Sequence, residues 1–177
     1  MTLTFSIRGA HAHELPSLAP LELRAAERFR DSPHAYAIEL PAFDSEKLAE
    51  LHRAGTVWVA VAGDEELLGF ALGGWLGTEA YLHELDVEPA HGRRGIGRAL
   101  VRQVAAWAKR ADAQSLLLST FSDVPWNAPY YSRLGFELVP LEDYSPTMLA
   151  QRRSDAVAGL LVTSRVMMRA PLERLLG

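Results

Sequence analysis

The segment that most constrains the fold is a strand-to-helix transition in the middle of the chain. The sequence predicts a strand over Ala80–Val87, and Pro89 ends it because proline has no N–H for a further ladder bond. The glycines of Gly95-Ile96-Gly97 then open a helix that runs to Ala111. Apolar side chains recur along this helix at steps of three or four residues, as on one buried helix face: Ile96, Leu100, Val104, Trp107 and Ala111. A strand that leads directly into such a helix predicts an α/β arrangement.

The rest of the chain supplies more strands than helices. Apolar or alternating runs predict strands over Leu3–Arg8, Thr56–Ala62, Leu67–Leu76, Ser115–Phe121, Phe136–Val139 and Ser164–Arg169. Helices are predicted over His13–Arg30, broken near Pro16 and Pro20, from Asp44 or Ser45 to Arg53, and over Asn127–Leu134 and Ser145–Gly159. The turn Gly63–Glu66 joins two of the strands as an antiparallel hairpin. We therefore expect one α/β (α+β) domain over residues 1–177, with a mixed, mostly antiparallel sheet flanked by helices.

Composition excludes several classes of protein. Hydrophobic residues make up 49% of the 177 residues and charged residues 23%, which is ordinary for a globular domain. There is no cysteine, so disulfides, thiolate nucleophiles and iron–sulfur clusters are excluded. The six histidines show no metal-binding spacing, and we expect no metal. No signal peptide or membrane-spanning run is visible, so we expect a cytoplasmic protein with no membrane partner.

The charges are distributed unevenly. The formal net charge is −4, which opposes a nucleic-acid-binding role. Residues 31–88 carry twelve acidic and two basic side chains, whereas residues 89–111 carry six basic side chains and no acid. A concentrated positive charge on an acidic protein indicates a site for an anion.

The glycine turn suits a phosphate group. Glycines let a ligand approach the backbone closely, and the first turn of a helix leaves N–H groups unpaired. Arg93, Arg94 and Arg98 add full charges beside them. A dinucleotide fingerprint would need a third glycine where Leu100 stands, and a nucleotide-triphosphate loop would need Lys-Ser/Thr where Arg98-Ala99 stands. Both of these alternatives are disfavoured.

Two motifs carry a resemblance to a known family. The segment His83–Leu100 is similar to the acetyl-CoA-binding motif of the GNAT superfamily of N-acetyltransferases, in which V-x-P is followed by Q/R-x-x-G-x-G/A and a long helix. The segment Asn127–Phe136 resembles the N-x-x-x-x-Y-x-x-x-G-F signature of the same family. One position departs from the pattern, because Gly92 stands where the family has Gln or Arg. Arg93 and Arg94 are expected to compensate.

The resemblance implies a GNAT-like domain with acetyl-CoA as co-substrate. It places the pantetheine arm along the backbone of Leu85–Val87 and the pyrophosphate at the start of the helix. The residues that it implies for cofactor binding are Leu85, Val87, Arg93, Arg94, Gly95, Ile96, Gly97, Arg98, Ala99, Asn127 and Tyr130.

The resemblance also points to catalytic residues. Tyr131 stands where the family has its thiolate-protonating tyrosine, and a phenol with a pKa of about 10 can protonate a thiolate. Tyr130 is its local rival, or a packing residue. Glu84 and Asp86 are candidates to deprotonate the amine, with His83 a weaker one. Strand alternation places Glu84 and Asp86 on one face and His83 on the other.

The function that follows is direct transfer of an acetyl group from acetyl-CoA to a primary amine of a small molecule or peptide. With no cysteine, no covalent thioester intermediate is expected. The alternative is a non-catalytic acyl-CoA-binding or sensing domain. The acidic region 31–88 favours a cationic acceptor. The family often forms dimers, so a homodimer is a further expectation, and the final strand near Val166–Arg169 could lie at its interface.

Overall fold

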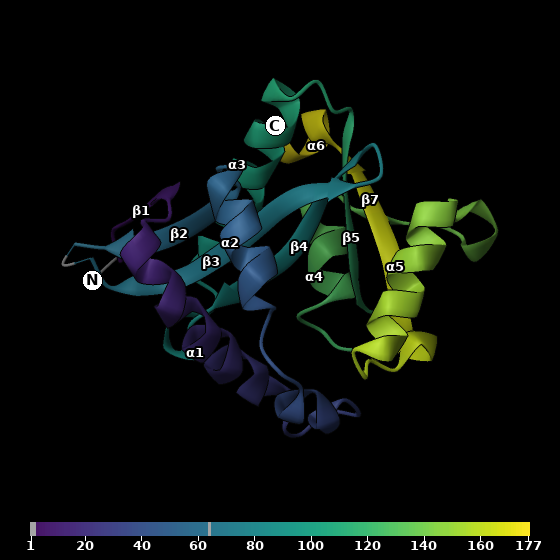
Figure 1. Ribbon diagram of the computed structural model, residues 1–177, viewed down its shortest axis with the longest axis horizontal. Helices are drawn as coiled ribbons and strands as arrows, with labels where there is room; N and C mark the ends of the chain where they lie inside the picture. Colours follow the sequence, from purple (N-terminus) through teal and green to yellow (C-terminus); the bar gives the residue numbers. More distant parts are fainter. Residues whose placement is uncertain (1–2, 64) are drawn as a thin grey trace. The chain divides into compact units, whose positions relative to one another are not determined.

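The computed structural model describes residues 3–63 and 65–177 (Figure 1). The strands are β1 (Phe5–Gly9), β2 (Val57–Ala62), β3 (Leu67–Leu76), β4 (Glu79–Val87), β5 (Ser115–Phe121), β6 (Glu137–Leu138) and β7 (Arg165–Pro171). The α-helices are α1 (Leu15–Ala26), α2 (Ser45–Arg53), α3 (Ile96–Arg110), α4 (Ala128–Leu134), α5 (Pro146–Val157) and α6 (Leu172–Leu176). Short 3-10 turns are η1 (Ala12–Glu14), η2 (Glu27–Phe29), η3 (Ala35–Glu39), η4 (Pro89–His91), η5 (Leu141–Asp143) and η6 (Val162–Ser164).

The strands form a mixed sheet. Within the described residues, seven strands hydrogen-bond in the order β1-β2-β3-β4-β5-β7-β6. β4 and β5 pair in parallel, whereas the pairs β1–β2, β2–β3, β5–β7 and β6–β7 are antiparallel. The expected fold class, a mixed and mostly antiparallel sheet flanked by helices, is therefore confirmed.

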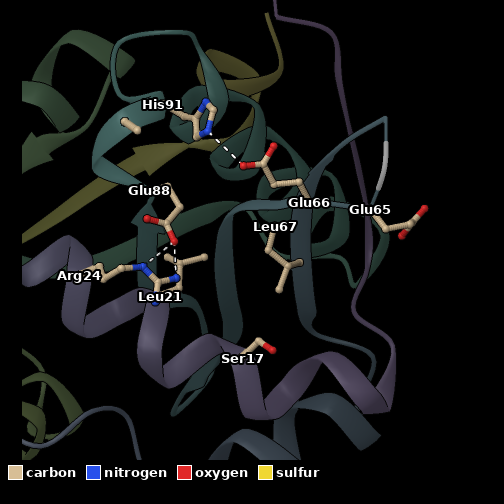
Figure 2. A pocket seen from close by; sticks show the side chains of 9 residues that line it. Ser17, Leu21, Arg24, Glu65, Glu66, Leu67, Glu88 and His91 are labelled. Carbon is tan, nitrogen blue, oxygen red and sulfur yellow. Dashed lines mark hydrogen bonds and ion pairs between the residues drawn. The ribbon is translucent and has the colours of Figure 1, made fainter.

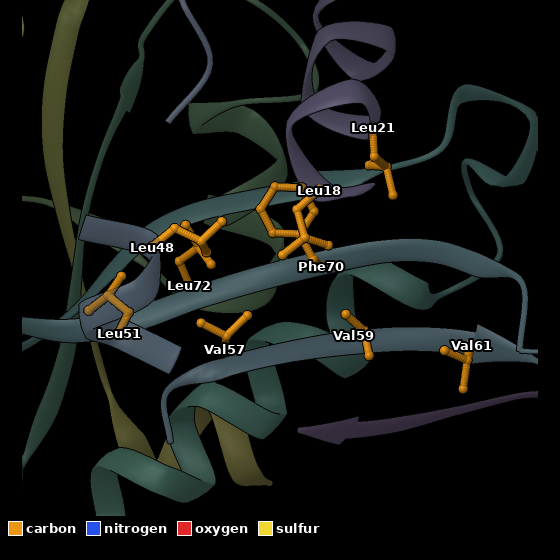
Figure 3. Packing of buried hydrophobic residues seen from close by; sticks show 9 residues of the cluster. All are labelled: Leu18, Leu21, Leu48, Leu51, Val57, Val59, Val61, Phe70 and Leu72. Atoms are coloured by element: carbon orange, nitrogen blue, oxygen red, sulfur yellow. The ribbon is translucent and has the colours of Figure 1, made fainter. Parts of the chain in front are cut away.

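Contacts divide the chain into two compact units. The first unit comprises Met1–Gly74 and His83–Val104, and the second comprises Trp75–Leu82 and Ala105–Gly177. In the first unit, α1 and α2 cover one face of β2 and β3, and Figure 3 shows their leucines directed onto the valines and Phe70 of these strands. Burial of this cluster stabilises the packing of the two helices on these strands.

Local signals fixed the ends of α2. Asp44 is the N-cap, and its carboxylate accepts a hydrogen bond from the amide of Lys47 at 2.8 Å. Gly55 follows the helix with φ +73°, a conformation that glycine adopts without strain. Both features were expected from the sequence.

The expected break in the first helix is wrong. α1 continues through Pro20, and Pro16 lies in its first turn, where the absent N–H has no intrahelical partner to lose. Leu18, Leu21 and Ala25 of this helix are buried. Their packing offsets the backbone hydrogen bond that Pro20 removes.

The second unit is built on β5 and β7. Their antiparallel pairing extends from Ser115↔Pro171 to Phe121↔Arg165. Figure 1 shows α5 running alongside β7, and Met148 of α5 packs in a buried cluster with Leu117 and Met167. α6 was not predicted from the sequence; it follows β7 without a break and buries Leu172 and Leu175. Within residues 3–63 and 65–177, no helix has both the length and the apolar character needed to cross a bilayer.

Candidate functional site

The glycine turn of the first unit has an open backbone. β4 ends at Val87, η4 follows, and α3 begins at Ile96. Gly95 has φ +84°, and a Cβ atom added there would meet no heavy atom within 4 Å. Arg93 also adopts positive φ, at 60°. Because the first intrahelical bond of this turn is donated by the amide of Ala99 to the carbonyl of Gly95, the amides just before Ala99 have no acceptor within the helix and can bind a ligand.

Three arginines surround this turn. Arg93, Arg94 and Arg98 are exposed, and across the described part of the chain none of them forms an ion pair. Ile96 is buried between them and anchors the helix start in the core. Free amides, the positive end of a helix dipole and unpaired guanidinium groups fit a pyrophosphate group.

Two pairs of oppositely charged or ionisable side chains link this loop to other parts of the first unit. Arg24 of α1 donates to the carboxylate of Glu88 at 2.9 Å through Nε, and His91 Nε2 lies 3.6 Å from Glu66 Oε1 (Figure 2). These residues line a cavity of about 500 Å³ together with Ser17, Leu21, Glu65, Leu67 and Ala90. Since Arg24 and His91 already face carboxylates there, we assign the cavity no ligand.

The end of β4 lies close to β3. A Cβ atom on Gly69 would lie 2.5 Å from the carbonyl oxygen of Asp86 and 3.1 Å from Cα of Val87. The parallel register of β4 with β5 covers only Ala80–Leu82, although β4 continues to Val87. Backbone groups of Leu85 and Val87 thus lie beyond the last residues of β4 that pair with β5.

His83 of β4 faces α2. A Cβ atom on Gly74 would meet both His83 Nε2, at 2.7 Å, and a methyl group of Leu51. Glu22 of α1 and Arg28 of η2 are among the charges that act on Asp86. The alternation predicted for β4, with Glu84 and Asp86 on one face and His83 on the other, stays a prediction.

Asp86 is the most perturbed carboxyl group of this region. Burial raises its pKa well above the ordinary value, and the negative charges of Glu84 and Glu22 raise it further, while Arg28 opposes them. Its Oδ2 atom is buried and has no hydrogen-bond partner among the described residues. A carboxylate whose pKa is raised is a stronger base than an ordinary carboxylate. Glu22 and Arg28 were missed by the sequence analysis because no local motif links α1 to β4.

His83 has the opposite perturbation. Burial lowers its pKa to about 4, and the charge of Lys47 contributes in the same direction. Its ring lies edge-on to Phe43 with centroids 6.2 Å apart. The imidazole is therefore neutral at pH 7 and a weak base, which disfavours the role of His83 as the proton acceptor.

The signature residues of the second unit lie at the start of α4. Tyr131 is buried, and its ring lies edge-on to those of Tyr130, at 5.3 Å, and Phe136, at 5.6 Å. Gly135 ends the helix with φ 109°. Asn127 occupies the N-cap position, but its side chain makes no capping hydrogen bond. Its amide is thus not used to cap the helix.

A buried charge network ties α5 to β5 and β7. Asp155 accepts hydrogen bonds from Arg165 Nε at 2.9 Å, from Ser119 at 3.0 Å and from Gln151 at 2.8 Å. Arg165 also donates to the carbonyl oxygen of Ser119 and lies over the ring of Phe121. The hydroxyl group of Ser119, near the end of β5, is thus part of this network. Among the described residues, no group of three or more histidine or acidic side chains could hold a metal ion.

Comparisons with solved structures support the same fold. PaiA N-acetyltransferase from Thermoplasma acidophilum, solved with coenzyme A, aligns with a TM-score of 0.69 over 96% of this chain and 99% of its own, at 16% identity. Ribosomal-protein-S18-alanine N-acetyltransferase from Escherichia coli aligns with a TM-score of 0.62 over 96% of this chain and 94% of its own, at 18% identity. N-acetylglutamate synthase from Neisseria gonorrhoeae aligns with a TM-score of 0.71 over 96% of this chain but 35% of its own, at 17% identity.

The sequence itself matches a family model. Residues 18–136 match the model of the acetyltransferase (GNAT) family, which is more than half of the chain and includes both motifs. The matched range contains the glycine turn and Tyr131. The chain therefore belongs to the GNAT family and is an acetyltransferase that uses acetyl-CoA as its co-substrate.

Proposed function

We propose that residues 1–177 act as one domain that transfers an acetyl group from acetyl-CoA directly to a primary amine of a small molecule or peptide. The observation that carries this proposal is the open turn at Gly95, at the N-terminus of α3, with three exposed arginines around it that form no ion pair with any described residue. This turn fits the pyrophosphate of a coenzyme A thioester. A cytoplasmic location and a homodimer are part of the proposal and rest on composition and family resemblance.

The binding roles follow from these positions. Backbone groups of Leu85 and Val87 pair with the pantetheine arm, and the amides of Arg94–Arg98 hold the pyrophosphate. The short Cβ distance between Gly69 and this part of β4 supports a strand end of fixed shape. Asn127 and Tyr130 are proposed to lie near the cofactor. The side chain of Asn127 makes no capping hydrogen bond to α4, which supports that role.

The chemistry needs an acid and a base. The amine nitrogen attacks the thioester carbonyl, so that a C–N bond forms and the C–S bond breaks. Tyr131 gives its phenolic proton to the leaving thiolate. Glu84 or Asp86 accepts the proton of the amine, and the raised pKa of Asp86 supports this residue.

The acceptor class follows from charge. The end of β4 carries Glu84 and Asp86, and Glu22 of α1 adds a third carboxyl group. Among the groups that act on Asp86, Arg28 is the cation. An excess of negative charge favours an acceptor that arrives as a cation, such as an aminoglycoside, a polyamine or a peptide N-terminus.

The test is release of coenzyme A thiol from acetyl-CoA in the presence of a panel of primary amines, with mass spectrometry of the acetylated product. Thiol release that depends on the amine, with a matching product, supports the proposal. Tight binding of acetyl-CoA without release for any amine in the panel would instead identify an acyl-CoA-binding domain without catalysis.

A further inference from the structure

Carboxyl groups from two elements act on one buried position in the first unit. Asp86 and Glu84 come from β4, and Glu22 comes from α1. Arg28, in η2, is the cation that acts on Asp86. Glu22 and Arg28 precede Glu84 and Asp86 by more than fifty positions in the sequence, and the fold brings the two pairs together.

Glu22 is held in a fixed position. The amide of Phe43 donates to both of its carboxylate oxygens, at 2.9 and 3.1 Å. This bond attaches the segment before α2 to α1. Burial raises the pKa of Glu22, and the hydrogen bond from Phe43 partly opposes that effect. The carboxyl group therefore cannot turn toward bulk solvent without loss of this bond.

One carboxylate oxygen of Asp86 has no hydrogen-bond donor among the described residues. Its Oδ2 atom is buried and accepts no hydrogen bond within the part of the chain that the structure describes. A buried carboxylate without a donor costs free energy, and a proton or a cationic ligand removes that cost. The held carboxyl group of Glu22 increases the demand for a positive charge at this position.

We propose that Glu22 is a positioning residue that prepares Asp86, and not Glu84, to accept the proton of the acceptor amine. This inference rests on the proposed function and deepens it by assigning the base. The acceptor arrives as an ammonium ion, drawn by the two carboxyl groups. Its N–H bond breaks, the proton moves to Oδ2 of Asp86, and the freed lone pair on nitrogen attacks the thioester. Glu22 keeps its bond to Phe43 and gives or takes no proton.

The variant Glu22→Gln tests the inference with little change of shape, because the amide oxygen can still accept from Phe43. Removal of a negative neighbour favours the ionised form of Asp86. We expect the acid limb of the pH profile of kcat/KM to move to lower pH by at least about half a unit. The carboxyl carbon of Asp86, followed by NMR in 13C-labelled protein, should titrate at a pH lowered by the same amount. Glu27→Gln is the control, because Glu27 of η2 lies in an exposed ion pair with Arg30. It should leave both the acid limb and the titration of Asp86 unchanged.

Two further variants separate the candidate bases. Asp86→Asn should remove the acid limb and lower kcat by about 100-fold or more, whereas Glu84→Gln should retain the limb. An acid limb that survives in Asp86→Asn, or that stays in place in Glu22→Gln while only the melting temperature falls, overturns the inference. If the wild-type enzyme releases no thiol with any amine, the proposed function itself fails. The NMR titration then still decides whether Glu22 acts on Asp86.

Discussion

Gly69 of β3 packs against the carbonyl oxygen of Asp86 in β4, and a Cβ atom at position 69 would lie 2.5 Å from that oxygen. The obstacle is backbone, which cannot rotate away as a flexible side chain could. Any side chain at position 69 must therefore displace the strand segment that carries Asp86 and Val87. This contact links a small residue of the hairpin to the proposed cofactor-binding backbone.

Gly69→Ala should damage both stability and cofactor binding. Displacement of packed backbone typically costs about 1–3 kcal/mol, and we expect a loss of that size in urea unfolding. The shifted strand end should also raise the KM for acetyl-CoA several-fold. Gly9→Ala is the matched control, because a Cβ atom there meets nothing within 4 Å. A KM unchanged in Gly69→Ala would show that this part of β4 does not contact the cofactor.

Tyr131→Phe should lower kcat at least about tenfold, because the phenylalanine ring cannot protonate the thiolate. The affinity for acetyl-CoA should change little, since the ring contacts with Tyr130 and Phe136 remain. Stopped-flow thiol release and calorimetric titration with coenzyme A measure the two quantities. Tyr130→Phe serves as the comparison. A kcat that falls in this variant but not in Tyr131→Phe would transfer the acid role to Tyr130.

The exposed arginines should account for much of the cofactor affinity. Loss of Arg94 and Arg98 in the double alanine variant should weaken coenzyme A binding by about 10- to 100-fold. The remaining binding should depend less on salt, because screening acts on these charges. Arg153→Ala, at an exposed position of α5, is the control. Equal salt dependence in the wild type and the double variant would contradict a phosphate role.

Local signals explain how much of this structure was predictable. Asp44 and Gly55 mark the ends of α2 by side-chain and backbone chemistry that lies within a few residues, and both were expected. The order of the strands along the chain and the glycine turn were also predictable, because each depends on a contiguous pattern. The family match over residues 18–136 then identifies the co-substrate.

Long-range contacts explain what was missed. The path of α1 through Pro20 depends on burial of its leucines against β2 and β3, which no window around the proline contains. The charge of Glu22 acts on Asp86 from a helix more than sixty residues earlier in the chain. Periodicity within β4 carries no information on so distant a residue, so this pair could not be predicted.

The buried pair Asp155–Arg165 should be essential for stability. Asp155→Ala leaves the guanidinium of Arg165 buried without its carboxylate, and removal of one partner of a buried pair costs about 3–5 kcal/mol. Urea unfolding measures the loss. The double variant Asp155→Leu with Arg165→Met should recover a large part of it, because no unpaired charge remains. Equal losses in the single and double variants would contradict a role for the unpaired charge.

The pair Arg8–Glu14 should make stability depend on acid pH. Arg8 donates to both carboxylate oxygens of Glu14, at 2.8 and 2.9 Å, and this lowers the pKa of Glu14 from 4.5 to about 2. A carboxyl group with a lowered pKa stabilises the fold above its ordinary pKa, and this contribution is lost as the pH falls from about 4.5 to about 2. Glu14→Gln should therefore cost on the order of 1–3 kcal/mol at pH 7, and the difference from the wild type should shrink below pH 4. Urea unfolding at pH 7, 4 and 3 measures this, with Glu142→Gln, an exposed carboxyl in η5, as the control. A difference between Glu14→Gln and the wild type that stays constant over this range would show that the pair contributes no proton-linked stability.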